Sequence, residues 1–545
     1  LPTCSTFEDS DSKKPDICLC ASINGSFIFY LASLLKDFRP LGKTDNISYY
    51  LTVKGFFMNF KTDKVDYEFK TEPFDHQRTA LERSWREKSH ALFMEMGTGK
   101  TKVAIDNAAV LHETGLVDAV LIIAPKGVFD NWLKSEIPAH LPDRIDRKLL
   151  RWQPNHTKTF LKEFEALTFE FFYGLKILAM NVEGLSTNKA IEFAEIFLEN
   201  NESNMVIVDE STNIKNRGAK RTFNIVSLRR KAKFRRILTG SPITKSPMDL
   251  FSQCEFLEPA CLGFTSYYAF QGRYANVQRR NMGPRQFNQI VGYRKLDELS
   301  EKLDKFSTRV LKEDCLDLPD KVYVRRDVNL TPQQMKMYDQ MKKLALTQFE
   351  NGELSTTASV LTQIMRLQQI CCGFLAPDDG DIQVLPSNRL SELMSVVDEL
   401  QGKAIIWASY THDIQQIADA LRDRFGPQSV ATYYGETPQD ERQEIIQKFQ
   451  DPDDPLQFFV GQPRTGGYGI TLTAAKTVVY YSNNYDLEIR LQSEDRAHRI
   501  GQTNKVTYID LVTPGTIDEK ILKALRNKIN LASEVLGEDA KTWLM

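Results

Sequence analysis

The chain contains no apolar run long enough to span a membrane. Its most apolar early run, "FIFYLASLL" from Phe27 to Leu35, is much shorter than the roughly 20 residues that a membrane-spanning helix requires. No positively charged leader precedes this run, so we do not expect a signal peptide there. The sequence therefore predicts no membrane association.

The chain also lacks cysteine pairs with metal-binding spacing, and it has no strong net charge. Eight cysteines are scattered along the chain, and neither Cys18 with Cys20 nor the adjacent Cys371 and Cys372 belongs to two C-x-x-C pairs. We therefore expect no zinc site and a reduced, cytoplasmic compartment. The net charge is only −2, so any contact with nucleic acid must come from local basic patches and backbone amides.

The length of 545 residues is too great for one hydrophobic core and predicts two to four domains. The stretch from Asn46 to Lys70 is rich in aromatic and β-branched residues, so residues 1–70 are expected to form a small β-containing accessory domain. Short apolar runs alternating with amphipathic stretches then occur in two series, as is typical of buried parallel strands and their helices. The predicted fold class is α/β, with one parallel-sheet unit at 71–318, including a helical segment at about 250–318, and a second at 319–545 with a helical tail.

The stretch "FMEMGTGKT", Phe93 to Thr101, follows an apolar run and precedes a helical pattern. A glycine-rich turn in this position directs backbone N–H groups at phosphate oxygens, at the positive end of a helix. Lys100 would meet the β- and γ-phosphates of a nucleotide, and the Thr101 hydroxyl would hold magnesium. The strict P-loop pattern has glycine where this chain has Met94, so a chance glycine-rich turn is the alternative. The residues expected to bind ATP here are Gly97, Thr98, Gly99, Lys100 and Thr101.

The run "MVIVDEST", Met205 to Thr212, places an acidic pair at the end of an expected strand. Ligands bind at this edge of open α/β sheets. Asp209 would hold magnesium, and Glu210 would orient and deprotonate an attacking water. The alternative, an acidic cap on a helix N-terminus, is less consistent with a P-loop upstream.

Three further polar residues are candidates for the same site. Gln77 lies upstream of the glycine-rich turn, and its amide offers the donor and acceptor that an adenine edge requires. Thr239 and Ser241 follow another apolar run, "RRILTG", and could relay between the nucleotide and a second ligand. Each alone could be an ordinary surface or turn residue.

Two arginines near the C-terminus share one helix face, in "RLQSEDRAHRIGQ". Arg496 and Arg499 are three residues apart, and guanidinium groups suit phosphate. The alternative is a solvated helix face on which these arginines pair with Glu494 and Asp495.

In order and spacing, these motifs resemble the motor core of helicase superfamily 2, and specifically its Swi/Snf-type branch. The resemblance covers about residues 71–535 and is carried by "MEMGTGKT", "IIAPKGVFDNWLKSE", "VDESTNIKNRGAKR", "LTGSPI", "TGGYGITLTAA" and "RLQSEDRAHRIGQTNKV". It implies two RecA-like lobes, with ATP and magnesium as cofactors and double-stranded DNA as the partner. It also implies that Arg496 and Arg499 reach across a cleft to the γ-phosphate, with Gln492 touching the nucleotide or the lobe interface.

The chain departs from the branch's usual pattern at several points. The acidic box reads DEST, which keeps Asp209 and Glu210, and His76 stands where an aromatic residue is common. The large inserts of eukaryotic chromatin remodellers are not recognisable, so the resemblance is to compact bacterial, archaeal or phage members. We expect a monomer in a bacterial or phage-infected cell, with a possible protein partner for residues 1–70.

The resemblance also suggests where DNA and interlobe coupling residues lie. Lys126 and Thr471 are expected to contact the DNA backbone. Thr239, Ser241, Gly467 and Gly469 are expected to couple the nucleotide site to the DNA.

A basic segment lies outside the family motifs. From Gln271 to Leu296 there is no acidic residue, whereas six residues are basic and aromatic residues are interleaved. Arg279, Arg280 and Arg285 of this segment are candidates for DNA contact, and a solvated basic loop is the equally plain alternative.

The function predicted from these features is an ATP-dependent translocase on duplex DNA. A branch-migrating or annealing motor acting on forked DNA, and an ATPase that recycles RNA polymerase, are alternatives within the same family. A non-catalytic scaffold that kept the fold is the alternative from another class, and the presence of Lys100, Asp209, Glu210, Arg496 and Arg499 counts against it.

Overall fold

The computed structural model describes residues 67–126, 128–282, 285–350, 357–376, 381–466 and 470–536. The chain separates into two compact units, Leu1–Glu68 and Phe69–Met545. Residues 1–66 lie outside the described ranges, and with them nearly all of the predicted accessory domain and its protein partner site. The described helices and strands all belong to the second unit.

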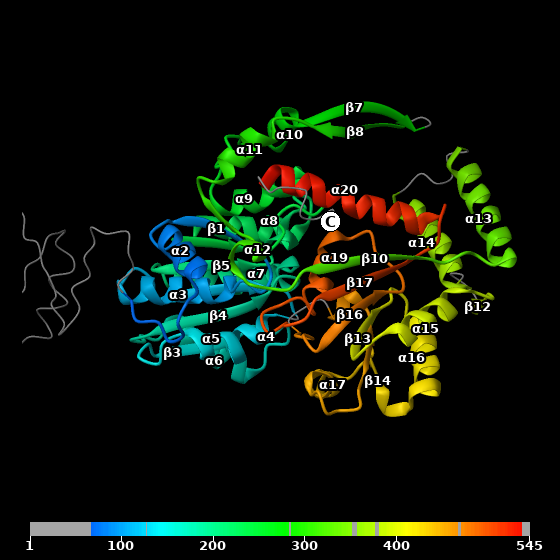
Figure 1. The fold of residues 1–545 in the computed structure, drawn as a ribbon. Helices are drawn as coiled ribbons and strands as arrows, with labels where there is room; N and C mark the ends of the chain where they lie inside the picture. The colour runs from blue at the N-terminus through cyan, green and yellow to red at the C-terminus, as the bar shows by residue number, and fades with distance from the viewer. Residues whose placement is uncertain are drawn as a thin grey trace, which may run out of the picture. The chain divides into compact units, whose positions relative to one another are not determined.

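The first half of this unit is built on a seven-stranded sheet in which every neighbouring pair is parallel (Figure 1). Strands β2 (Ala119–Ala124) and β5 (Asn204–Asp209) are buried along their whole length because they are central and covered on both faces. Their continuous apolar runs reflect that position. In spatial order the strands are β3 (Arg147–Arg151), β4 (Leu175–Asn181), β2 (Ala119–Ala124), β5 (Asn204–Asp209), β6 (Phe234–Leu238), β1 (Ser89–Met94) and β9 (Ser307–Val310).

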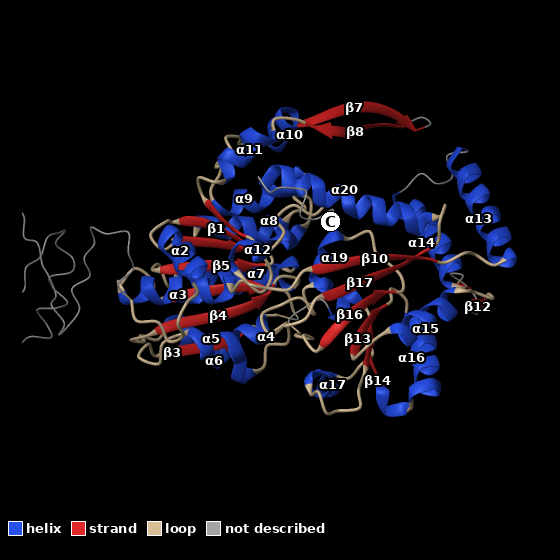
Figure 2. Ribbon diagram, in the orientation of Figure 1, coloured by secondary structure: helices blue, strands red, loops and turns tan. Residues whose placement is uncertain are grey.

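Helices flank this sheet (Figure 2). Leu121 and Ile123 of β2 belong to one core cluster with Phe197 and Ile225, which come from helices α7 and α8. The helices of this half are α2 (Asp75–Ser84), α3 (Lys100–Glu113), α4 (Phe129–Asn131), α5 (Ile137–His140), α6 (Lys158–Phe169), α7 (Asn188–Glu199), α8 (Lys220–Ser227), α9 (Leu250–Leu257), α10 (Tyr267–Tyr274), α11 (Leu296–Leu303) and α12 (Lys312–Cys315).

The segment expected to be helical, about 250–318, contains more than helices. Between α10 and α11, strands β7 (Ala275–Met282) and β8 (Arg285–Tyr293) form an antiparallel hairpin. Little in the sequence predicts it, because Asn, Gln and Arg dominate both strands and no alternation of apolar residues marks them. The strand β9 also belongs to this segment and completes the first sheet.

The second half contains a six-stranded sheet, again parallel throughout. Its strands, in spatial order, are β10 (Lys321–Asp327), β17 (Val506–Val512), β16 (Ala475–Tyr480), β13 (Lys403–Trp407), β15 (Phe458–Gly461) and β14 (Val430–Tyr433). The α/β fold class with two parallel-sheet lobes is therefore confirmed. We call the half with the seven-stranded sheet lobe 1 and the half with the six-stranded sheet lobe 2.

The helices of lobe 2 include a long C-terminal helix that contacts both lobes. Helix α20 packs Ile521 and Leu525 into a lobe 2 core cluster, whereas its Leu531 packs against the core of lobe 1. Its start is held by Arg389, which is fully buried and pairs with Asp518. The helices are α13 (Pro332–Glu350), α14 (Thr357–Cys372), α15 (Arg389–Glu399), α16 (Thr411–Phe425), α17 (Gln439–Gln450), α18 (Pro463–Gly466), α19 (Leu487–Glu494) and α20 (Ile517–Leu536).

The sequence predicts no membrane-spanning helix and no zinc site, and the described part of the chain can be searched for both. None of its helices combines the length and apolar character needed to cross a bilayer. Within the same residues, no cluster of three or more His, Cys, Asp or Glu side chains is arranged to hold a metal ion.

Candidate active site

The turn between β1 and α3 has the shape that its glycines permit. Gly97 and Gly99 adopt φ angles of 84° and 85°, in the left-handed region that side chains with a Cβ rarely adopt. A Cβ on Gly99 would also lie 2.1 Å from the amide nitrogen of Gln77. Lys100 is the first residue of α3, so the turn delivers its free N–H groups at the positive end of a helix. This geometry suits a bound phosphate.

Gln77 and His76 support this turn from α2. The Gln77 Nε2 donates to the carbonyl oxygen of Thr98 at 3.1 Å, and its Oε1 accepts from the Phe74 backbone N–H. His76 Nε2 lies 2.8 Å from the same Thr98 oxygen. The adenine-binding role of Gln77 stays a prediction, since one end of its buried amide contacts the turn in this structure and the other end contacts the start of α2.

The acidic pair lies at the carboxyl end of β5, opposite the turn. Lys100 Nζ is 3.8 Å from Glu210 Oε1, and both side chains are about nine-tenths buried. Burial raises the pKa of Glu210 above its ordinary value, and the Lys100 ammonium opposes that shift. Glu210 has a φ of 47°, an unfavourable conformation for a residue with a Cβ, and such strain is common where function demands a particular side-chain position.

Trp132 is a part of the site that the sequence did not reveal. Its indole Nε1 donates to Asp209 Oδ2 at 2.8 Å, while Asp209 Oδ1 accepts from the Glu210 backbone N–H at 2.9 Å. Trp132 is buried and begins a π-helical turn, Trp132–Glu136, a form often found at functional sites. The only signal in the sequence was its place in the motif "APKGVFDNW". The two donors fix the Asp209 carboxylate where β5 ends.

From lobe 2, both arginines of the last motif lie against the glycine-rich turn of lobe 1. The Arg496 Nη2 is 3.7 Å from the sulfur of Met96, and a Cβ on Gly97 would be 3.7 Å from Arg499 Cγ. Arg496 also donates to the backbone oxygens of Gln492 and Ile470, whereas Arg499 donates to the Thr471 hydroxyl at 3.0 Å. The structure thus brings the side chains of both arginines against the turn that is expected to hold phosphate.

The alternative, in which these arginines pair with Glu494 and Asp495, can be compared with the ion pairs of the two acids in the described part of the chain. Glu494 pairs with Arg490 and Lys321, and Asp495 pairs with Lys312. Both acids therefore have other cationic partners.

Lys312 joins the two lobes beside the turn. Its ammonium donates to Asp495 Oδ1 at 2.6 Å and to the His498 carbonyl oxygen at 2.8 Å, both in lobe 2. Its backbone N–H donates to Glu95, which precedes the glycines. Burial lowers the pKa of Lys312, and the carboxylate of Asp495 counteracts this. The contact connects the glycine-rich turn with the end of α19.

A second interlobe contact starts from the DEST box. Thr212 Oγ1 donates to Glu488 Oε1 at 2.6 Å, and Lys215 Nζ donates to Glu488 Oε2 at 3.1 Å. Lys215 also donates to the Thr244 hydroxyl. Glu488 lies on α19, one helical turn before Gln492. The last residue of the DEST box therefore touches the same helix that precedes the arginines.

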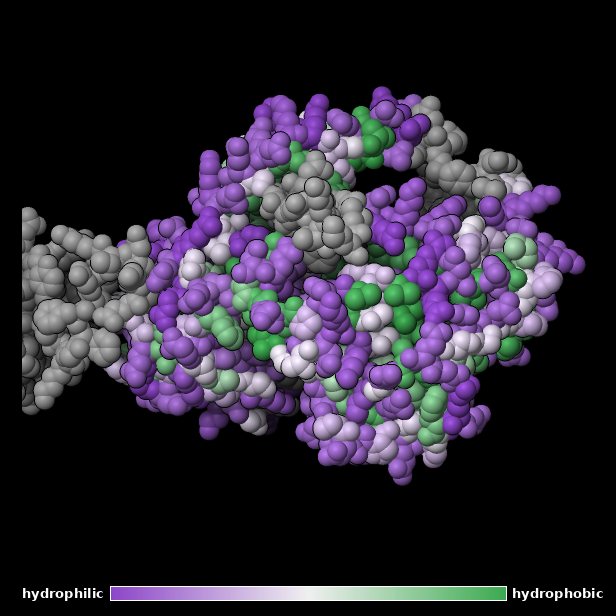
Figure 3. Space-filling view, viewed as in Figure 1, coloured by the Kyte–Doolittle hydropathy of each residue, from purple (hydrophilic) through white to green (hydrophobic). Residues whose placement is uncertain are grey.

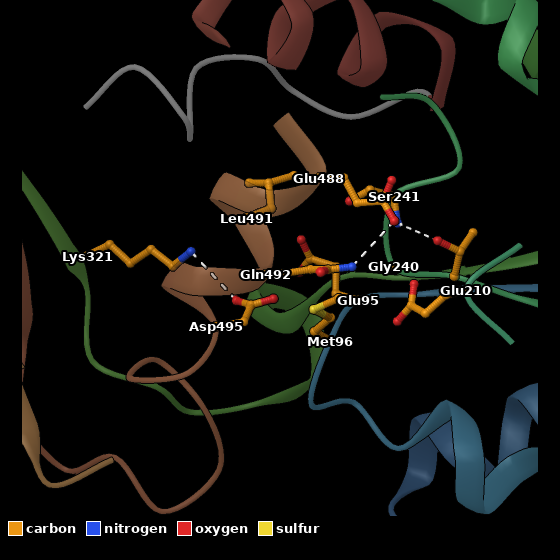
Figure 4. A pocket seen from close by; sticks show the side chains of 11 residues that line it. Glu95, Met96, Glu210, Gly240, Ser241, Lys321, Glu488, Leu491, Gln492 and Asp495 are labelled. Atoms are coloured by element: carbon orange, nitrogen blue, oxygen red, sulfur yellow. Dashed lines mark hydrogen bonds and ion pairs between the residues drawn. The ribbon is translucent and has the colours of Figure 1, made fainter. Parts of the chain in front are cut away.

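A crevice of about 380 Å³, including space open to solvent, lies between these groups (Figure 4). Figure 4 shows α19 and its end facing the turn and Glu210 across this crevice. Thr239 and Ser241 line it as well, and the Ser241 backbone N–H donates to Thr239 Oγ1. Its lining is formed by Glu95, Met96, Glu210, Thr239, Gly240, Ser241, Lys321, Glu488, Leu491, Gln492 and Asp495.

Family models match both halves of the chain. A model described as "SNF2-related domain" matches residues 76–374, more than half of the chain, and one described as "Helicase conserved C-terminal domain" matches residues 387–501. The chain belongs to the SNF2 family of helicase-like ATPases.

Individual SNF2 relatives are distant and mostly longer. The SWI/SNF chromatin-remodeling complex subunit snf22 of Schizosaccharomyces pombe is 27% identical over 461 residues, which cover 81% of this chain and 26% of that protein. The uncharacterized ATP-dependent helicase MG018 of Mycoplasma genitalium is 25% identical over 82% of this chain and 40% of its own length. The chain therefore spans only about a quarter to two-fifths of these relatives. A solved SWI2/SNF2 ATPase core from Sulfolobus solfataricus, in complex with dsDNA, is 25% identical, with a TM-score of 0.38 over 88% of this chain and 95% of that one.

The residues predicted to contact DNA or to couple the lobes are spread over several elements and do not form one cluster in the described part of the chain. Lys126 is exposed just beyond β2, and Thr471 is half-buried beside Arg499. Gly467 and Gly469 lie outside the described residues. Arg285 lies on β8, and its side chain is not among those that the structure describes. Arg279 and Arg280 are exposed on β7. These assignments remain predictions.

The Thr212 contact leads to a testable expectation. A Thr212→Val substitution keeps the shape but removes a hydrogen bond to a carboxylate, of a kind that contributes about 1.5–3 kcal/mol. Because that bond joins the lobes, we expect ATP turnover to fall about tenfold with little change in KM for ATP. Steady-state ATPase kinetics measure this, with Thr79→Val, which removes an exposed hydroxyl on α2, as the matched control. Unchanged turnover in Thr212→Val would show that the contact has no part in catalysis.

Proposed function

We propose that this SNF2-family chain is a DNA-dependent ATPase that moves along duplex DNA. The observation that supports this most is the division of the site between the lobes. Lys100, Asp209 and Glu210 come from lobe 1, whereas Arg496 and Arg499 come from lobe 2 and lie on the same turn. A site assembled from two lobes makes hydrolysis depend on their closure, which converts turnover into relative motion.

The residues present fit ATP and its magnesium ion. The Asp209 carboxylate and the Thr101 hydroxyl are oxygen ligands of the kind that magnesium prefers, together with phosphate oxygens. A magnesium ion held there would neutralise part of the triphosphate charge. The indole of Trp132 would keep the Asp209 carboxylate in position for this role.

The chain's own groups account for the remaining chemistry. The N–H groups of the turn and Lys100 would bind the phosphates, and Glu210 would accept a proton from the attacking water. Arg496 and Arg499 would neutralise charge that develops as the bond to the γ-phosphorus breaks. The position of Gln492 on the crevice wall is consistent with a contact to the nucleotide or the lobe interface.

Support for DNA as the partner comes from the SNF2 family membership and from the relatives' names, which include a chromatin-remodeling complex subunit and an ATP-dependent helicase. The motor domains shared with those relatives would track the DNA backbone without reading its sequence. The described residues contain no feature that favours forked DNA or RNA polymerase over plain duplex.

The test is the ATPase rate of the full chain with no nucleic acid, duplex DNA, forked DNA, single-stranded DNA and RNA. We expect duplex DNA to raise the rate most. Equal rates with and without DNA would reject a DNA-dependent motor, and no turnover under any condition would favour the scaffold. Stimulation only by forked DNA would favour the branch-migrating alternative.

A further inference from the structure

The hairpin β7–β8 is anchored at its base, where it joins α10 and α11. We call the part of the two strands beyond this base the arm. At the base, Glu298 of α11 pairs with Arg273 and Lys302 and accepts from the Tyr274 hydroxyl at 3.0 Å. Arg294 donates to the Gly272 carbonyl oxygen at 2.6 Å. The basic residues nearest the base thus serve the fold, which anchors the hairpin to lobe 1.

Beyond the base, the hairpin has the composition of a nucleic-acid contact. Arg279 and Arg280 are exposed, and neither guanidinium has a hydrogen-bond or ion-pair partner among the residues that the structure describes. No acidic residue occurs from Gln271 to Leu296, so none is available within the arm. Its other exposed polar side chains are amides, which together with arginine are common contacts to phosphate and sugar: Asn276, Gln278, Gln286, Asn288 and Gln289.

The two arginines differ from those cations of lobe 1 that have carboxylate partners. Arg78 pairs with Glu72, and Arg144 pairs with Glu113. Figure 3 shows hydrophilic side chains along much of the hairpin and a small hydrophobic patch. Val277 of β7 and Val291 of β8 are 40% and 44% exposed. A two-stranded ribbon with so little burial is marginally stable alone. A polyanionic partner would both neutralise and cover it.

The strand geometry indicates how such a partner would be held. Successive residues of a strand point to opposite faces, so Arg279 and Arg280 project from opposite faces of the ribbon. Asn288 is opposite Arg279 in the register, and Phe287 is opposite Arg280. A two-stranded ribbon fits the major groove of B-form DNA.

We propose that the β7–β8 hairpin is a DNA-binding arm that lies along a groove of the duplex, with Arg279 and Arg280 contacting phosphates of the two opposing backbones. The inference rests on the proposed function, because it assumes that duplex DNA reaches lobe 1. It assigns the contact to a segment outside the motor motifs. The arm would extend the grip on DNA beyond the cleft without entering the ATP site.

The test measures duplex binding by the full chain across a salt series from about 50 to about 200 mM. Each phosphate contact contributes about 0.9 to the slope of log affinity against log salt concentration. We therefore expect Arg279→Ala with Arg280→Ala to reduce that slope by about 2 and to raise the DNA concentration needed for half-maximal ATPase stimulation. The ATPase rate without DNA should be unchanged.

The matched control is Lys158→Ala with Lys162→Ala. These exposed lysines lie one turn apart on α6, which packs on the edge strand β3 at the opposite end of the sheet from β9. Replacing both arginines of the hairpin by lysine should keep most of the slope, because the charge remains.

The outcomes separate this inference from the proposed function. Suppose that wild-type protein binds duplex DNA and that its ATPase rate responds to it. The arm is then not the contact if the double alanine variant of the hairpin keeps the full salt slope of DNA affinity. The same conclusion follows if the double alanine control on α6 loses as much of that slope. If wild-type turnover does not respond to DNA, the proposed function fails and the inference with it. Thermal unfolding of each variant shows whether a changed slope reflects lost folding instead, and a lowered melting temperature that lysine does not restore would count against the arm.

Discussion

Replacing Arg499 by alanine is expected to lower ATP turnover by about 10³- to 10⁵-fold, the range found for arginine fingers, while ATP still binds. The Arg499 side chain comes from lobe 2. Its Cγ lies next to Gly97 of the turn, and its guanidinium donates to Thr471. Its charge would matter most when negative charge builds up on the transferred phosphoryl group, so its loss should appear in kcat and not in affinity. Single-turnover hydrolysis and calorimetric titration of ATP measure the two quantities separately.

Companion variants make this result specific. Arg499→Lys should recover only part of the activity, because an ammonium lacks the planar fork. Arg422→Ala, which removes a partly exposed arginine of lobe 2, is the control and should leave turnover unchanged. Arg496→Ala is less clean, because Arg496 also donates to two backbone oxygens and its loss should lower the melting temperature as well. Wild-type turnover by Arg499→Ala would remove this residue from the catalytic site.

The second large effect is expected from Lys100→Ala, which should reduce turnover at least about 10²- to 10³-fold and also weaken ATP binding. Lys100 begins α3 and is buried beside Glu210, so its ammonium is already held where the β- and γ-phosphates would lie. Because it would contact phosphate in the ground state and the transition state alike, both KM and kcat should change. Steady-state kinetics and nucleotide titration give both values.

Lys189→Ala is the matched control for Lys100→Ala, since Lys189 is an exposed lysine on α7 of the same lobe. Its kinetics should equal those of the wild type. If Lys100→Ala hydrolysed ATP at the wild-type rate, the glycine-rich turn would not be the phosphate site. If the wild-type protein itself did not hydrolyse ATP, the result would support the alternative of a non-catalytic scaffold.

Much of the fold could be predicted because it depends on local patterns. The apolar runs of β2 and β5 indicated buried parallel strands, and both lie at the centre of the first sheet. The hairpin β7–β8 was not predicted, because its strands are poor in β-branched residues and, of its described side chains, only Ala275 is buried, so that burial imposes no alternation. Its basic character was visible in the sequence, but its shape was not.

The chemistry proposed for the turn, the acidic pair and the arginines rests on short motifs, because each depends on residues adjacent in the chain and on backbone conformations that only certain residues adopt. The contacts that join these motifs could not, because their partners are far apart in sequence. Trp132 meets Asp209 only once the sheet of lobe 1 has formed. Thr212 meets Glu488, and Lys312 meets Asp495, only once both sheets have formed and α19 has closed against lobe 1. No local pattern encodes such pairings, since they depend on the packing of the whole chain.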